Sequence, residues 1–157
     1  MANPLTLIMP IKEGVSLQQL GGVLSSFLPK IVEAMTTIGT VHDARFVLMD
    51  ASTPNLQPGP NGPYRLAIIT TYDGDFDTYI QDFLNNIGMI FDALLSVTSD
   101  GEHLVPVSQN LEAFAEYVAK NDASRHPPSD SLPPFSAYPC TVQQVLAADP
   151  CPQAASS

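Results

Sequence analysis

Apolar and polar residues follow one another along this chain in runs that predict three β-strands. Residues Leu5 to Ile11 form a short, nearly continuous apolar run, which is typical of a central strand buried on both faces. Residues Val41 to Met49 predict a second strand. Residues Tyr64 to Tyr72, which are rich in Ile and Thr, predict a third.

Apolar residues at helical spacing predict two long helices and a shorter third one. Ser16 is a plausible N-cap of the first helix, and Gly39 is placed to end it. Pro29 lacks an amide hydrogen and is expected to kink that helix or restart it. Asp75 is the expected N-cap of the second helix, and the third is expected from about Asn110 to Ala119.

The remaining segments are predicted to be irregular or short. Residues 53–63 contain four prolines and two glycines, so they form a surface loop. This loop is either a solvated connector or a cover that folds over the mouth of a pocket. Phe135 to Tyr138 predict a short last strand near a sheet edge, and Thr141 is the expected cap of a closing helical turn. Residues 1–149 are expected to form one domain, and residues 150–157 a frayed tail.

The order of these elements predicts an α+β fold of the ferredoxin-like type. Strand, helix, strand, strand, helix, extra helix and strand follow the βαββαβ plan with one helix inserted before the last strand. The helices are expected on one face of an antiparallel sheet. The other face must then meet something, and a second copy of the sheet is the simplest candidate.

The composition favours a globular chain and excludes some partners. The 157 residues are 45% hydrophobic and only 14% charged, and the low charged fraction suggests that a partner covers part of the surface. The chain is acidic, with a formal net charge of −10 and scattered basic residues, so nucleic acid is not an expected ligand. No apolar run approaches the roughly 18 residues of a membrane span, and no start region resembles a signal peptide. We therefore expect a soluble cytoplasmic protein without a membrane partner.

The two cysteines, Cys140 and Cys151, are too few for a disulfide framework. They are expected to be reduced thiols, although they could close a small loop under oxidising conditions.

A pattern across the second and third predicted strands carries a resemblance to a known superfamily. It consists of His42-x-x-Arg45-Phe46-Val47, then Thr71-Tyr72-Asp73-Gly74-Asp75, and then Tyr79. With the element order, this pattern resembles the dimeric α/β-barrel superfamily, in an uncharacterised bacterial branch, over roughly residues 5–95. The resemblance implies a homodimer of two ferredoxin-like sheets packed face to face. It does not fix a function, because the superfamily includes cofactor-free monooxygenases, haem enzymes, isomerases and ligand-binding modules.

His42 and Tyr72 form the first half of the candidate site. If Asp50 pairs with Tyr64, the register places His42 opposite Tyr72 on one face of the sheet. A neutral imidazole there is a candidate general base, with Tyr72 as hydrogen-bond donor to a developing oxyanion. The alternative is a partly buried histidine bonded to backbone.

Arg45 and Asp73 form the second half. The same register places Arg45 on the other face, together with Asp43, Thr71 and Asp73. The simpler interpretation is a structural ion pair near an interface. The sharper hypothesis is that Arg45 binds an anionic or carbonyl oxygen in a cavity, with Asp73 orienting it or acting as a base.

Cofactor motifs are weak in this sequence. No His, Cys or Asp cluster has metal-ligand spacing, and the acids at Asp73, Asp75 and Asp77 lack the glycine and distal glutamate of a calcium loop. No proximal-histidine motif of a haem peroxidase is recognisable. We therefore expect no metal and no cofactor, with haem as a remaining alternative.

Three functions follow from these observations. The first is a homodimer without a catalytic motif that buries its sheet face. The second is a small-molecule enzyme of the cofactor-free oxygenase, isomerase or lyase type, with His42, Arg45, Tyr72 and Asp73 around a pocket for a small apolar or anionic ligand. The third is a haem-associated protein of the peroxidase-like branch.

Overall fold

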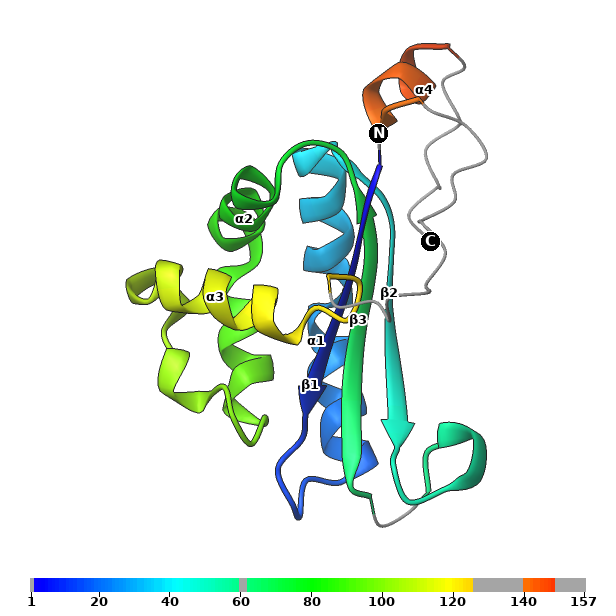
Figure 1. The fold of residues 1–157 in the computed structure, drawn as a ribbon, viewed down its shortest axis with the longest axis vertical. Helices are drawn as coiled ribbons and strands as arrows, with labels where there is room; N and C mark the ends of the chain where they lie inside the picture. The colour runs from blue at the N-terminus through cyan, green and yellow to red at the C-terminus, as the bar shows by residue number, and fades with distance from the viewer. Residues whose placement is uncertain (1, 60–61, 126–139, 149–157) are drawn as a thin grey trace.

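The structure, a computed structural model, describes residues 2–59, 62–125 and 140–148 (Figure 1). Within them the chain forms three strands: β1 (Asn3–Pro10), β2 (Val41–Asp50) and β3 (Tyr64–Tyr72). The α-helices are α1 (Leu17–Ile38), α2 (Phe76–Ser96), α3 (Leu111–Asn121) and α4 (Val142–Ala148). Three 3₁₀ turns join them: η1 (Pro54–Leu56), η2 (Glu102–Leu104) and η3 (Val107–Gln109). The described chain is thus α+β, as predicted.

The strands form one antiparallel sheet in the order β1–β3–β2. β3 is therefore the central strand of the described sheet. Burial alternates along β1, where Leu5, Leu7 and Met9 are buried and the residues between them are half-exposed. The prediction that this segment is buried on both faces is wrong, because the described helices cover only one of them.

The register between β2 and β3 matches the prediction over most of its length, from Asp50 opposite Tyr64 to Asp43 opposite Thr71. A β-bulge between Val41 and Asp43 then places Val41, and not His42, opposite Tyr72. The predicted pairing of His42 with Tyr72 is therefore wrong. The extra residue of the bulge releases His42 from the ladder, and the apolar Val41 takes the buried position.

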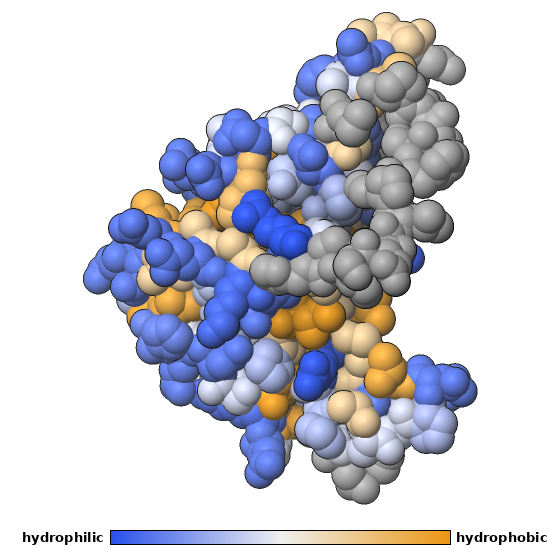
Figure 2. Space-filling model, in the orientation of Figure 1, coloured by the Kyte–Doolittle hydropathy of each residue, from blue (hydrophilic) through white to orange (hydrophobic). Residues whose placement is uncertain are grey.

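The two faces of the sheet differ in their cover. Both α1 and α2 lie on one side, where they form the core with the inward residues of the strands (Figure 1). We call the opposite side the open face. It carries the side chains of Thr6, Ile8, Asp43, Arg45, Val47, Met49, Arg65, Ala67, Ile69 and Thr71. Figure 2 shows hydrophobic residues at the surface beside the loop that follows β2.

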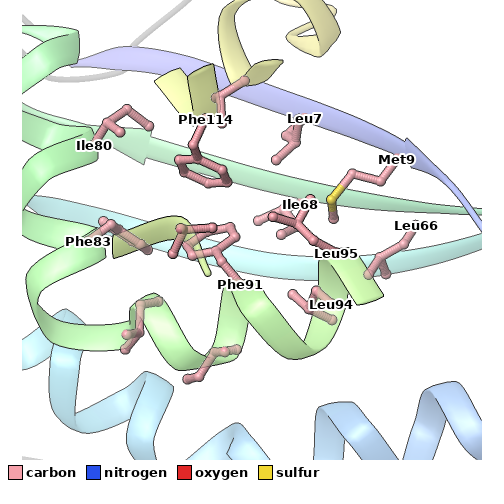
Figure 3. Close-up of a cluster of buried hydrophobic side chains, with 14 of the residues drawn as sticks. Leu7, Met9, Leu66, Ile68, Ile80, Phe83, Phe91, Leu94, Leu95 and Phe114 are labelled. Atoms are coloured by element: carbon pink, nitrogen blue, oxygen red, sulfur yellow. The ribbon is translucent and has the colours of Figure 1, made fainter. Parts of the chain in front are cut away.

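The core lies between the sheet and α2 (Figure 3). Leu7 and Ile68 project from the strands towards Phe91 and Leu95 of α2. The ring of Phe114 from α3 meets Phe91 edge to face, with centroids 5.0 Å apart at 63°. This contact fixes α3 against α2 beside the edge of β1.

Local signals set the ends of the long helices as predicted. Ser16 and Gln19 form a capping box at the start of α1, with hydrogen bonds of 3.2 and 2.8 Å, and Gly39 ends the helix at φ 65°. Asp75 caps α2 by accepting a hydrogen bond of 2.9 Å from the Thr78 amide. α1 continues through Pro29 as one helix, so of the two expected effects, a kink or a restart, the restart does not occur. Pro29 lies on its exposed side, where water can satisfy the carbonyl that the missing amide leaves free.

The shorter elements also match the sequence where the structure describes them. α3 covers the predicted third helix, and Thr141 and Gln144 cap the start of α4 with hydrogen bonds of 2.9 and 3.2 Å. The predicted last strand, Phe135 to Tyr138, and the predicted tail lie outside the described residues. Among the described helices, none is long and apolar enough to span a membrane.

Candidate functional site

His42 and Asp73 lie in contact at the end of the sheet where β2 begins and β3 ends. The His42 Nε2 atom is 3.1 Å from the Asp73 Oδ1 atom, and the two side chains are 14% and 11% exposed. The Asp73 amide also donates a 2.8 Å hydrogen bond to the carbonyl of Thr40, which fixes the chain on both sides of the pair. The structure thus joins two residues that the sequence placed on opposite faces, and the bulge in β2 is the reason.

The second oxygen of Asp73 holds α4. The Val142 amide donates to Asp73 Oδ2 at 2.8 Å, and the Gln143 side chain donates to the carbonyl of Gly39 at 2.9 Å. Asp73 therefore links β3, β2 and α4, whose residues lie about 70 positions further along the chain. Figure 1 shows α4 at this end of the sheet, near the N-terminus.

The electrostatics of the pair define its protonation. Burial acts to raise the pKa of Asp73, but hydrogen bonds from the Val142 amide and from His42 outweigh it, so that this pKa lies below its ordinary value. Asp73 is therefore a carboxylate that only accepts, and His42 Nε2 must carry the proton that it shares with Asp73. In a neutral imidazole this leaves Nδ1 as the basic nitrogen.

Tyr72 points to the helix side of the sheet, away from Arg45. Its residue is 5% exposed, and its ring stacks on Tyr79 with centroids 3.9 Å apart. Burial raises the pKa of Tyr72, and the positive charge of Arg125 partly offsets that rise. Tyr72 lines an open hollow of about 460 Å³ with Ser124 and Arg125.

Arg45 lies on the open face and is exposed. The ion pairs among the described residues are Lys12–Glu102, His42–Asp73 and Arg125–Asp122, so none of them includes Arg45. The expected ion pair of Arg45 with Asp43 or Asp73 is not formed within this part of the chain. Of the four predicted site residues, the structure brings together only His42 and Asp73.

Metal and thiol chemistry add little to this picture. The described residues contain no group of three or more His, Cys, Asp or Glu side chains that could hold a metal ion. His103 is exposed on η2, and Cys140 is exposed before α4. Cys151 lies outside the described residues, as does His126.

A hollow on the open face contains residues that the sequence did not single out. It is lined by Ile8, Met49, Ala51, Leu56 and Arg65, with a volume of about 180 Å³. Leu56 belongs to η1, so the loop after β2 supplies part of the wall of this hollow. The sequence does indicate the face of Arg65: it lies four residues before Ile69 on β3, and residues an even number apart on a strand point to the same face.

Comparisons with family models, curated proteins and solved structures returned no significant match for this chain. The fold and the contacts above are therefore the basis for any functional inference, and membership of the dimeric α/β-barrel superfamily stays a prediction.

Proposed function

We propose that this chain is a ferredoxin-like module that forms a homodimer through the open face and acts by binding rather than by catalysis. The observation that carries the proposal is the unequal cover of the sheet by the described residues, whose helices α1 and α2 pack on one face. The apolar residues Ile8, Val47 and Ile69 of the open face come one from each described strand and are only half-buried. Burial of such side chains against a partner stabilises the complex, because it removes apolar surface from water.

Element order supports the ferredoxin-like part of the proposal. β1, α1, β2, β3 and α2 follow the βαββα part of that plan, and both outer strands run antiparallel to β3. The strand that would complete the plan falls at Phe135 to Tyr138, outside the described residues.

Charge on the open face favours a second copy as the partner. Asp43 and Arg45 lie two residues apart on β2, so both point to the open face. A two-fold axis through the face brings each side chain of one copy towards the other copy's surface, where opposite charges are available. A face that carries both signs around an apolar centre is therefore able to complement itself.

The area of the open face indicates which kind of dimer to expect. Three strands of about nine residues span about 30 by 14 Å, given about 3.3 Å per residue and about 4.8 Å between strands. This is about half of the roughly 800 Å² that each partner contributes to a standard interface. An interface of this size lies at the small, transient end of the range, so we expect a dimer that dissociates on dilution and not an obligate one.

Sedimentation equilibrium tests this proposal directly. The unchanged chain is expected to shift with concentration from 16.8 kDa to twice that mass. Ile69→Asp, at the centre of the open face, is expected to abolish the shift, because dimerisation would have to remove its carboxylate from water at the apolar centre of the face. Val32→Asp is the matched control, since Val32 is 58% exposed on α1, on the other side of the molecule. A monomer at every concentration, or equal effects of the two variants, would refute the homodimer.

A second candidate is the small-molecule enzyme, and the His42–Asp73 pair supports it. A carboxylate that fixes one imidazole tautomer leaves the other nitrogen as a proton acceptor. It ranks second because Asp73 also holds α4, while Tyr72 and Arg45 lie elsewhere. Its test is a ligand-detected NMR screen of small carbonyl compounds: hits that His42→Gln removes would support it, and hits that survive His42→Gln would contradict it.

The haem alternative is tested by adding hemin to the purified chain. A shifted Soret band that His42→Ala removes is the result that this alternative requires. An unshifted band would exclude it.

A further inference from the structure

The hollow on the open face combines an apolar wall with one basic group. Ile8 comes from β1, Met49 from β2 and Arg65 from β3, while Ala51 and Leu56 come from the loop after β2. Met49 and Arg65 are direct cross-strand partners, and Pro10 is the partner of Arg65 on its other side. Three strands and a loop therefore converge on a single space of about 180 Å³.

The loop is held in the conformation that presents Leu56. Asn55 and Leu56 have φ values of 61° and 56°, in the left-handed region that residues with a Cβ rarely adopt. For a residue as bulky as leucine this is an unusual conformation, and such outliers gather at ligand-binding segments. A free connector would relax out of it, so other contacts must hold the loop in place.

Those contacts come from Asp50, a carboxylate buried at the end of β2 with 1% exposure. Its Oδ1 atom accepts hydrogen bonds from the Ser52 amide at 2.8 Å and the Ser52 hydroxyl at 2.6 Å. Its Oδ2 atom accepts from the Gly59 amide at 3.1 Å, which joins both ends of the loop. The Leu56 amide donates to the carbonyl of Thr53 at 3.2 Å. The wall of the hollow is thus pre-organised before any ligand arrives.

Arg65 supplies the charge at the rim. It is exposed, and the ion pairs among the described residues do not include it. Asp100 lines an adjacent hollow with Arg65, but the Tyr117 hydroxyl already donates to that carboxylate at 2.9 Å. A guanidinium beside an apolar wall suits a carboxylate, which it can bind through two parallel hydrogen bonds.

Size and charge narrow the ligand class. An apolar cavity of about 150 Å³ is large enough to hold benzene, so a space of about 180 Å³ fits one ring or a tail of about six carbons. The net charge of −10 disfavours anions that carry several charges. We propose that this hollow binds a small monocarboxylate whose ring or short chain contacts Ile8, Met49 and Leu56 and whose carboxylate pairs with Arg65.

Titration of the full chain with benzoate and hexanoate tests the proposal, followed by the NMR signals of the methyl groups of Ile8, Met49 and Leu56. We expect saturable shifts confined to this hollow, with a dissociation constant of about 1 mM for so small a ligand. Benzyl alcohol keeps the ring without the charge, and acetate keeps the charge without the tail. Both are expected to bind at least about tenfold more weakly than benzoate.

Two variants make the test specific. Arg65→Gln is expected to weaken benzoate binding at least about tenfold, whereas Lys30→Gln, which removes an equal charge from the exposed side of α1, is expected to leave it unchanged. The proposal is overturned if benzoate causes no saturable shift, if benzyl alcohol binds as tightly, or if Arg65→Gln and Lys30→Gln behave alike. Sedimentation reports the homodimer separately, so failure of that proposal and failure of this one are distinguishable.

Discussion

Asp122 offers the sharpest test of how the outer edge of β1 is closed. Its residue is 1% exposed and follows α3 directly. Its Oδ1 atom accepts hydrogen bonds from the Thr6 amide at 2.8 Å, the Ser124 amide at 3.0 Å and the Ser124 hydroxyl at 2.7 Å. The Ala123 amide donates to the carbonyl of Thr6 at 2.9 Å. The side chain of Asp122 therefore accepts the hydrogen bond that the Thr6 amide would otherwise donate to a neighbouring strand.

The magnitude follows from these three bonds, because the remaining contact of Asp122, with the Arg125 Nε atom 3.5 Å from Oδ2, is a partly exposed ion pair that contributes little. A hydrogen bond to a charged group contributes about 1.5–3 kcal/mol, so the upper limit for Asp122→Ala is about 5–9 kcal/mol. Ser124 is half-exposed, and its groups regain water when the carboxylate is removed. Loss of the hydrogen bond from the Thr6 amide, together with displacement of the chain, is then expected to lower the free energy of unfolding by about 2–4 kcal/mol. In a chain of this size, that corresponds to a fall in Tm of roughly 5–12 °C.

Guanidinium unfolding followed by far-ultraviolet circular dichroism measures this loss, since the chain has no tryptophan. Asp122→Asn keeps an acceptor and is expected to lose less stability than Asp122→Ala. Glu33→Ala, an exposed acid of α1 outside the ion pairs of the described residues, is the control and should change stability by less than about 0.5 kcal/mol. If Asp122→Ala behaves like Glu33→Ala, water replaces the carboxylate and this account of the β1 edge is refuted.

Three further predictions concern the core and the titrating groups. Phe114→Ala, at 1% exposure, is expected to cost about 3–5 kcal/mol in denaturant unfolding, whereas Leu111→Ala, 48% exposed on the same helix, should cost little. Because the pKa of Asp73 is lower in the folded chain, its carboxylate stabilises the fold above the unfolded-state pKa of about 4. This stabilisation is lost as the pH falls through the lower folded-state value, so Asp73→Asn should flatten the acid limb of a stability–pH profile. Burial raises the pKa of Tyr79 and of Tyr117, so stability should fall above about pH 10, where tyrosines of the unfolded chain ionise, and Tyr79→Phe should reduce that fall.

Helix ends and most of the β2–β3 register were predictable because their causes are local. Ser16, Gly39 and Asp75 act through bonds or backbone angles within a few residues of themselves. The non-helical Ile87 inside α2, at φ −133°, had no such signal. It depends on how α2 packs on the sheet and on η3, which the local sequence does not contain.

The bulge at His42 did have a signal. Apolar residues of β2 recur every second position at Ala44, Phe46 and Leu48, but the preceding one, Val41, lies three positions away from Ala44. One additional residue is needed for Val41 and Ala44 to face the same core, and this is what a bulge supplies. The candidate site was therefore only half predictable: His42 and Asp73 were named, but their contact depends on this single insertion, and Tyr72 and Arg45 lie elsewhere.

The apolar run of β1 misled for a reason that bears on function. Ile8 lies between the buried Leu7 and Met9, and as an apolar residue on the open face it makes the strand read as buried on both sides. The structure assigns Ile8 both to that face and to the wall of the 180 Å³ hollow. The residue that produced the wrong prediction is thus one that both proposals use.

The two proposals concern the same face, the homodimer its centre at Ile69 and the ligand its end at Arg65, and their relation can be measured. Ile69 and Arg65 are four residues apart on β3, or about 13 Å at about 3.3 Å per residue. A second copy packed on Ile69 would lie close enough to cover the hollow, and a ligand there would then be sealed or excluded. Because coupling between two binding events is reciprocal, saturating benzoate should shift the dimerisation constant by the same factor as dimerisation shifts benzoate affinity. Sedimentation with and without benzoate measures the first factor, and titration at low and high protein concentration measures the second. A factor of one in both measurements would show that the two events are not linked through this face.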